Sequence, residues 1–288
     1  HPAVLSLGLK YANGSIRGAN ARCRAMLQTF QTIIADYTQH STTTSAPPTT
    51  TTTTTKKNKS TTKDMRQDIE QSLLKPAFTY WTTHCRTHSV SMGNAFTFLK
   101  LAVANLDRDT TEAHAKTTLI EIIDTYVTQR IEFANQAISK YAGTKIVDGD
   151  VILTYAKSEV VQHLLEDAAS DTNHNTNTNT NNSTTPKKFR LIIVDSRPLL
   201  EGRKLLQNIL QSTTTTTHNI ECTYILLNSL SYVMMGEVTK VFLGAAALMS
   251  DGSVLARVGT ASIAMMARRK NIPVLVCCET YKISNRVQ

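Results

Sequence analysis

The chain has 288 residues, of which 41% are hydrophobic, so it is long and apolar enough to bury the cores of one or two domains. It contains no run of about 18 apolar residues, so we expect no membrane-spanning helix. The opening residues His1-Pro2-Ala3-Val4 lack the basic and apolar order of a signal peptide. Because the chain opens on His1 rather than on methionine, we expect it to be a piece of a longer protein.

The net charge of +9 favours an acidic or phosphorylated partner. Part of this charge comes from lysines at 56–59, inside a threonine-rich tract, where a lysine run is typical of a solvated loop. The chain has one Trp and no basic stripe interleaved with aromatic side chains. Direct nucleic-acid binding is therefore disfavoured.

The chain has five cysteines: Cys23, Cys85, Cys222, Cys277 and Cys278. Their odd number and their apolar surroundings are typical of reduced thiols in a cytoplasmic protein, not of a disulfide framework. His84 and His88 flank Cys85, but no second pair stands at the spacing of zinc ligands, so we interpret them as ordinary helix residues. We expect neither a metal nor a cofactor.

Three polar tracts of low complexity interrupt the sequence, at residues 41–63, 170–188 and 212–219. They hold too little apolar surface to offset the loss of chain entropy, so we predict disordered insertions in loops. Outside these tracts the pattern of apolar residues changes once, near residue 145, from helical spacing to short apolar runs.

Residues 1–145 are predicted to form a helical domain, because apolar side chains recur there at helical spacing. The first such series is Ile16, Ala19, Cys23, Met26, Leu27, Phe30, Ile33, Ile34 and Tyr37. A second long helix is predicted over 109–141, and shorter ones over 69–81 and 92–106.

Residues 146–288 are predicted to form a Rossmann-like domain with a parallel sheet, so the fold class is α/β. The pattern is one of short apolar runs, at 151–153, 191–194, 224–227 and 274–276, separated by stretches of helical texture. No Gly-x-Gly-x-x-Gly turn follows the first strand, which disfavours dinucleotide binding.

Ligands of such sheets bind beyond the carboxyl ends of the strands, where Lys157 and Arg197 could hold an anion beside Asp195. An equally weighted interpretation is structural. In it, Asp195 caps the next helix and Arg197 pairs with Glu201.

Four blocks of the sequence resemble a known family, at residues 15–23, 149–154, 194–203 and 244–260. This family unites the alpha, beta and delta regulatory subunits of the exchange factor for translation initiation factor 2 with methylthioribose-1-phosphate and ribose-1,5-bisphosphate isomerases. The first and third blocks, with residues 1–4 and 273–282, resemble its delta branch. The resemblance also implies a further strand and helix after Gln288, so we expect the second domain to be truncated there.

The isomerases of the family use a cysteine after the first strand and an aspartate from the last block. At those positions this chain has Ala156, Ala246 and Ser253, which supply neither thiol nor carboxylate, and Asp251 is two residues out of register. The resemblance therefore implies a protein that is not an enzyme. What it retains is a vestigial anion pocket, composed of Arg17, Lys157, Asp195, Arg197 and Ser253.

By resemblance, the chain is a regulatory and assembly subunit whose partners are the beta subunit and the alpha, gamma and epsilon subunits of one complex. It would also bind the alpha subunit of translation initiation factor 2, phosphorylated or unphosphorylated. We predict that Arg17, Arg22 and Arg24 make this contact. An ordinary solvated helix face is the alternative.

Contacts with related subunits are predicted at Met265, Glu279, Tyr281, Lys282 and Arg286, since aromatic and basic side chains anchor many interfaces. Burial inside the monomer is the competing explanation for the apolar part. Two other functions remain open: a sugar-phosphate isomerase with displaced catalytic groups, and a protein that senses a sugar phosphate or nucleotide.

Overall fold

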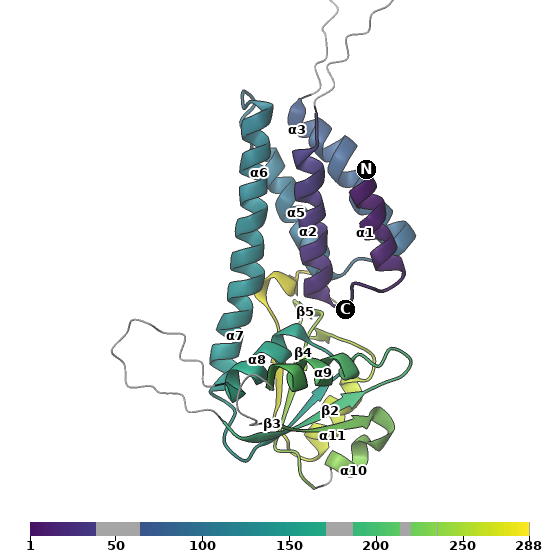
Figure 1. The fold of residues 1–288 in the computed structure, drawn as a ribbon, viewed down its shortest axis with the longest axis vertical. Coiled ribbons are helices and arrows are strands. Elements are labelled where there is room, and N and C mark those ends of the chain that lie inside the picture. The colour runs from purple at the N-terminus through teal and green to yellow at the C-terminus, as the bar shows by residue number, and fades with distance from the viewer. Residues whose placement is uncertain (39–63, 171–186, 214–219, 235, 288) are drawn as a thin grey trace, which may run out of the picture. The chain divides into compact units, whose positions relative to one another are not determined.

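The computed structural model describes residues 1–38, 64–170, 187–213, 220–234 and 236–287 (Figure 1). The predicted insertion at 41–63 lies outside these residues, as do most of those at 170–188 and 212–219. The ends of the latter two are described. Lys187 donates its backbone N–H to Ala168 O, and residues 212 and 213 belong to a helix.

The chain forms two compact units. The first contains His1–Arg17, Cys23–His88 and Ala95–Thr125, and the second contains Gly18–Arg22, Ser89–Asn94 and Tyr126–Gln288. The units are not contiguous in sequence, and a single boundary at residue 145 stays a prediction.

The first unit is helical, as predicted. Its elements are α1 (Pro2–Ala12), most of α2 (Ala19–Ala35), α3 (Met65–Asp68), η1 (Ile69–Leu74), α4 (Lys75–Tyr80), η2 (Trp81–Cys85), most of α5 (Val90–Ala104) and α6 (Glu112–Tyr126). The segments η1 and η2 are π-helical, so residues 65–85 form one continuous helical run.

Helix α2 forms because its apolar side chains fall on one face of a 3.6-residue period. Six of those in the predicted series are almost completely buried: Cys23, Met26, Leu27, Phe30, Ile33 and Ile34. The prediction of this helix is confirmed, although its regular part begins at Ala19 and ends at Ala35.

The core of the first unit is centred on Trp81, the one tryptophan of the sequence, which is fully buried. Its ring centroid lies 5.2 Å from that of Phe30 and 6.4 Å from that of Tyr11. Its indole N–H donates to Val4 O at 2.8 Å, which satisfies the polar atom of the ring.

The second unit contains η3 (Val127–Glu132) and α7 (Phe133–Gly143), which follow α6 without a break, so the predicted helix over 109–141 is two helices joined by a π-helical turn. Its main sheet has five parallel strands in the order β3-β2-β1-β4-β7. These strands are β1 (Val151–Tyr155), β2 (Phe189–Asp195), β3 (Ile220–Leu226), β4 (Lys240–Gly244) and β7 (Val274–Cys277). The Rossmann-like sheet is therefore confirmed.

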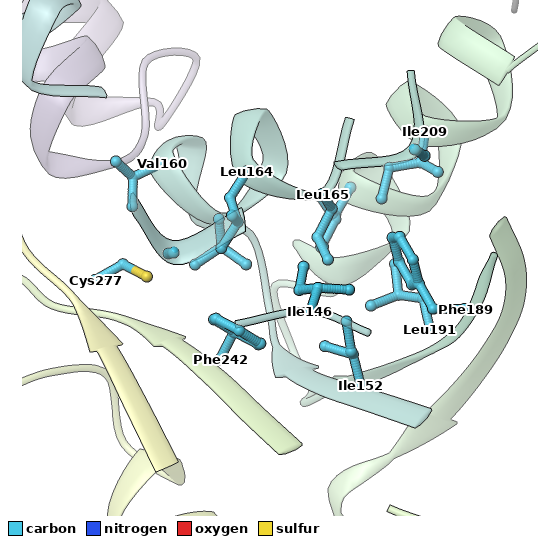
Figure 2. Close-up of a cluster of buried hydrophobic side chains, with 14 of the residues drawn as sticks. Ile146, Ile152, Val160, Leu164, Leu165, Phe189, Leu191, Ile209, Phe242 and Cys277 are labelled. Carbon is cyan, nitrogen blue, oxygen red and sulfur yellow. The ribbon is translucent and has the colours of Figure 1, made fainter. Parts of the chain in front are cut away.

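Two layers of helices cover this sheet. Helices α8 (Glu159–Ala169) and α9 (Gly202–Thr213) pack on one face, where Val160, Leu164 and Leu165 meet Ile152, Leu191 and Phe242 (Figure 2). Helices α10 (Leu230–Met234) and α11 (Thr260–Arg269) pack on the other face, against Leu153, Ile192 and Val241. Burial on both faces explains why the strands are apolar runs instead of alternating patterns.

A second sheet of three short strands, in the order β6-β5-β8, was not predicted. It consists of β5 (Ala247–Met249), β6 (Val254–Leu255) and β8 (Ile283–Ser284). Short 3-10 segments complete the unit: η4 (Leu227–Ser229) follows β3, and η5 (Thr280–Lys282) precedes β8.

Candidate functional site

The strand order reverses between β1 and β4, because β2 and β3 lie on one side of β1 while β4 and β7 lie on the other. Open parallel sheets bind ligands beyond the carboxyl ends of the strands at such a switch point. Here Ala156 follows β1, and Ala245 and Ala246 follow β4. Two of the three predicted degenerate positions therefore lie at the place where the fold puts a ligand.

Ala156 has an unusual main-chain conformation. Its φ is +54°, in the left-handed region that residues with a Cβ rarely adopt, and its N–H donates to Val194 O at 2.8 Å. The side chain is buried. The backbone is thus held in a strained form by the sheet although the side chain has no chemistry to perform.

The other two degenerate positions are equally unreactive. Ala246 donates its N–H to Leu255 O at 2.9 Å, which links it to the short sheet. Ser253 lies in the turn between β5 and β6, where its N–H and hydroxyl both donate to Asp251 Oδ1 at 2.9 and 2.6 Å. The Asp251 carboxylate is therefore engaged in closing a turn.

Glycine 244 allows a close approach at the switch point. A Cβ built there would collide with the side chain of Ser158, which begins α8. Ser158 therefore packs directly against the end of β4, at the switch point of the sheet.

Asp195 is fully buried at the end of β2 and is saturated with hydrogen bonds. It accepts from Ser196 N at 2.9 Å, from Arg203 N at 3.2 Å and from the Tyr224 hydroxyl at 2.9 Å. Burial and the adjacent Asp195 raise the pKa of Tyr224, so this phenol stays a donor. Asp195 caps α9, as the structural interpretation expected.

The pairing expected for Arg197 is wrong. Arg197 is exposed, and Glu201 forms its ion pair with Arg257, from the loop before α11. Glu201 is buried, and Arg257 reaches it from a segment that the sequence gives no reason to place nearby.

Tyr155 joins the same two loops at the end of β1. Its hydroxyl lies 2.8 Å from Ser196 Oγ and 2.7 Å from Val258 O. A Cβ at the next residue, Gly259, would lie 2.6 Å from that hydroxyl, and the φ of Gly259 is +100°. Glycine is needed at 259 both for the turn and for the approach of Tyr155.

The remaining members of the predicted anion pocket are distributed over both units. Lys157 is half-buried between β1 and α8, in the second unit, whereas Arg17 belongs to the first unit and donates Nε to Gly14 O at 2.8 Å. Arg22 is buried, which leaves its guanidinium little surface for a partner, and Arg24 is partly exposed.

Within the described residues, no group of three or more His, Cys, Asp and Glu side chains could hold a metal ion. None of the described helices has both the length and the apolar character needed to cross a bilayer.

Residues 279–284, which we call the clamp segment, contain a buried pair of opposite charges. Lys282 Nζ lies 2.5 Å from Glu279 Oε2 and 3.4 Å from Ala245 O, and neither side chain is more than 7% exposed. The Tyr281 hydroxyl donates to Asn20 Oδ1 at 2.7 Å, and Asn20 donates in turn to Glu279 Oε1.

Three of the five predicted interface residues are therefore buried inside the monomer: Glu279, Tyr281 and Lys282. Met265 and Arg286 are exposed, and an interface at these two stays a prediction. Asn20 also belongs to this cluster, and its role could not be predicted from the sequence because its partners lie at the other end of the chain.

Comparison with known proteins places this geometry in a family. The model of the initiation factor 2 subunit family matches residues 15–288. The translation initiation factor eIF2B subunit delta of Schizosaccharomyces pombe is 40% identical over the whole chain, which covers 52% of that protein. The delta subunit of Dictyostelium discoideum is also 40% identical over the whole chain, which covers 39% of it. The chain thus spans about half the length, or less, of these curated relatives.

A solved structure is similar over the same extent. The crystal structure of the tetrameric eIF2B beta2-delta2 complex of C. thermophilum contains a chain that superposes with a TM-score of 0.79 at 29% identity. The match covers 100% of this chain and 80% of that one. The sheet order, the alanines at the switch point and the match over 15–288 agree, and the chain belongs to the initiation factor 2 subunit family.

Proposed function

We propose that this chain is a non-catalytic regulatory and assembly subunit, of the delta type, of the guanine-nucleotide exchange factor for translation initiation factor 2. One observation carries the proposal. A likeness to delta subunits over the entire chain coincides with alanine at both switch-point positions, 156 and 246, where the resemblance places the reacting groups of the isomerases. A protein with neither thiol nor carboxylate there cannot perform their acid and base chemistry.

The partners follow from the same likeness. The related solved structure is a complex of beta and delta subunits, so a beta subunit is the first partner of this chain. The alpha, gamma and epsilon subunits would complete the assembly, with nucleotide exchange carried by another subunit, in the cytoplasm. The alpha subunit of translation initiation factor 2, phosphorylated or not, is the proposed regulatory partner.

The described surface leaves some predicted contacts available. Met265 on α11 and Arg286 after β8 are exposed and can meet a related subunit. Arg17 and Arg24 are partly exposed and can meet an acidic or phosphorylated partner, whereas the burial of Arg22 removes it from this set.

Coexpression with a beta subunit tests the proposal. We expect the two chains to copurify and to give one complex by native mass spectrometry at low micromolar concentration. The isolated chain should not turn over methylthioribose 1-phosphate or ribose 1,5-bisphosphate. A monomer with isomerase activity would contradict both parts of the proposal.

A second candidate is a protein that binds a sugar phosphate or a nucleotide without converting it. The left-handed backbone at Ala156 favours this candidate, since strained main-chain conformations cluster at ligand sites. Calorimetric titration with ribose 1,5-bisphosphate and with a nucleoside monophosphate distinguishes the two. Saturable binding heat that the variant Lys157→Ala abolishes would support a binding protein. Heats no larger than the heat of dilution would contradict ligand binding and leave assembly as the only proposed role.

A further inference from the structure

The clamp segment, residues 279–284, contacts the parts of three helices, α2, α5 and α6, that belong to the second unit. The Asn20 amide, in the first turn of α2, is held at both ends by Glu279 and Tyr281. The Asn94 amide, near the start of α5, donates to Tyr281 O at 2.9 Å and to Ile283 O at 2.8 Å. The ring of Tyr126, at the end of α6, lies edge-on to that of Tyr281 at 6.3 Å.

The same segment is tied to the switch point of the sheet. Lys282 Nζ reaches the carbonyl of Ala245, directly after β4, and lies 5.8 Å from the centroid of the Tyr281 ring. Residues 283 and 284 pair with β5, which follows Ala246. One stretch of six residues thus connects the carboxyl end of β4 with the starts of α2 and α5 and the end of α6.

The pair of charges at its centre is unusual because both side chains are removed from water. Burying an ion pair costs desolvation energy that the attraction of the charges only partly returns, so apolar residues of the same size stabilise most cores at least as well. Removing one member leaves a buried charge without a partner, which opens the structure around it. The clamp segment therefore keeps its conformation only while the two charges are matched, and the contacts of its neighbours depend on that conformation.

We propose that the clamp segment is a charge-locked conformational switch: the Glu279–Lys282 pair determines whether the first turns of α2 and α5 are ordered on the second unit. Asn20 and Asn94 connect the two helices to the clamp segment, since each amide side chain forms two hydrogen bonds with it. Both helices continue into the first unit, at Cys23 and Ala95. A partner that displaces Lys282 would therefore release the starts of both helices from the clamp segment, a step that rests on the proposed function.

Hydrogen–deuterium exchange of the full chain, free in solution, tests the switch without any partner. Lys282→Met removes the ammonium and keeps an apolar stem of similar length. We expect amide exchange in residues 18–24 and 90–96 to become on the order of 100-fold faster, because the uncompensated Glu279 opens the clamp. Strands β1 and β2 should exchange as in the parent. Exchange that stays at the parent rate in both helix starts, or that rises equally in β1 and β2, would overturn the proposal.

Three further variants test the proposal independently of Lys282→Met. Glu279→Gln with Lys282→Met removes both charges and should exchange more slowly at the helix starts than Lys282→Met alone. Tyr281→Phe removes the hydroxyl that donates to Asn20 and should raise exchange in 18–24 by about 10-fold, and by more than in 90–96. Arg190→Met breaks the ion pairs of Arg190 with Glu221 and Glu237 in the same unit, and should change neither helix start. A double variant that exchanges faster than the single one would contradict the charge lock.

Discussion

Glu201 forms its ion pair with Arg257 and not with Arg197, although Arg197 lies one helical turn before it in sequence. The carboxylate is buried and the guanidinium is partly exposed, so the pair links the start of α9 to the loop before α11. We predict that Arg257→Ala lowers the free energy of unfolding by about 1.5 to 3 kcal/mol, the usual contribution of a hydrogen-bonded charge with a buried partner.

Arg197→Ala is the matched control, because Arg197 is exposed and belongs to the same group of loops. Its effect should stay within about 0.5 kcal/mol in urea unfolding followed by circular dichroism. Equal losses for the two variants would show that the pair with Arg257 contributes nothing specific.

Acid should weaken the second unit through Asp150. Burial by itself would raise the pKa of this carboxyl, but hydrogen bonds from Lys240, from Val147 N and from Thr239, together with the charge of Lys240, outweigh burial and lower the pKa. A lowered pKa means that the stabilisation is complete above the ordinary Asp value of about 4 and is lost as the pH falls through the lowered value.

The variant Asp150→Asn tests this pH dependence. We predict a lower free energy of unfolding at pH 7 and a flatter dependence on pH between about 5 and 2, because the variant has no carboxylate to protonate there. Urea titrations at several pH values measure both quantities. A variant curve parallel to that of the parent over this range would rule out Asp150 as the group that titrates.

Trp81 makes the first unit observable by itself, because the second unit contains no tryptophan. Phe30→Ala removes a ring that packs against the indole, so we predict a loss of about 3 to 5 kcal/mol in the transition monitored by tryptophan fluorescence. Gln28→Ala, on the exposed side of the same helix, should change it by less than about 0.5 kcal/mol. Similar losses for both variants would contradict the burial assigned to Phe30.

Cys277 should be inert although it adjoins Cys278. Burial raises the pKa of the Cys277 thiol to about 12, and the charges of Glu279 and Cys278 act in the same direction. Because the thiolate is the nucleophile, iodoacetamide at pH 8 should leave Cys277 unmodified in the folded chain and alkylate it in denaturant. Tandem mass spectrometry of the peptide locates the label, and rapid labelling of Cys277 in the folded chain would disprove its burial.

The strands of the main sheet could be predicted because each is buried on both faces and leaves an apolar run in the sequence. The runs at 151–153, 191–194 and 274–276 lie inside β1, β2 and β7. β4 was missed although Val241, Phe242 and Leu243 form such a run, so its signal was present. The strands of the small sheet are two or three residues long, and no periodicity can be read from so few positions.

The candidate site could be predicted only where residue types decide the chemistry. The alanines at 156 and 246 could be identified from the sequence, since their side chains exclude acid and base catalysis. The partner of Tyr281 could not be predicted, because an aromatic hydroxyl suits an interface and a buried hydrogen bond equally well. The hydrogen bond from Tyr281 to Asn20 forms only when distant parts of the chain come together, and the local sequence pattern does not predict such contacts.

The contact between Asn20 and Tyr281 joins positions at opposite ends of the chain, 261 residues apart. At about 5 to 20 residues per second, a ribosome makes the asparagine roughly 10 to 50 s before its partner. During synthesis the first turn of α2 therefore emerges long before the tyrosine that will bind it. The contacts of the clamp segment with α2 and α5 can therefore form only after residue 284 has left the exit tunnel, so the starts of both helices stay without these partners until β8 has been synthesised.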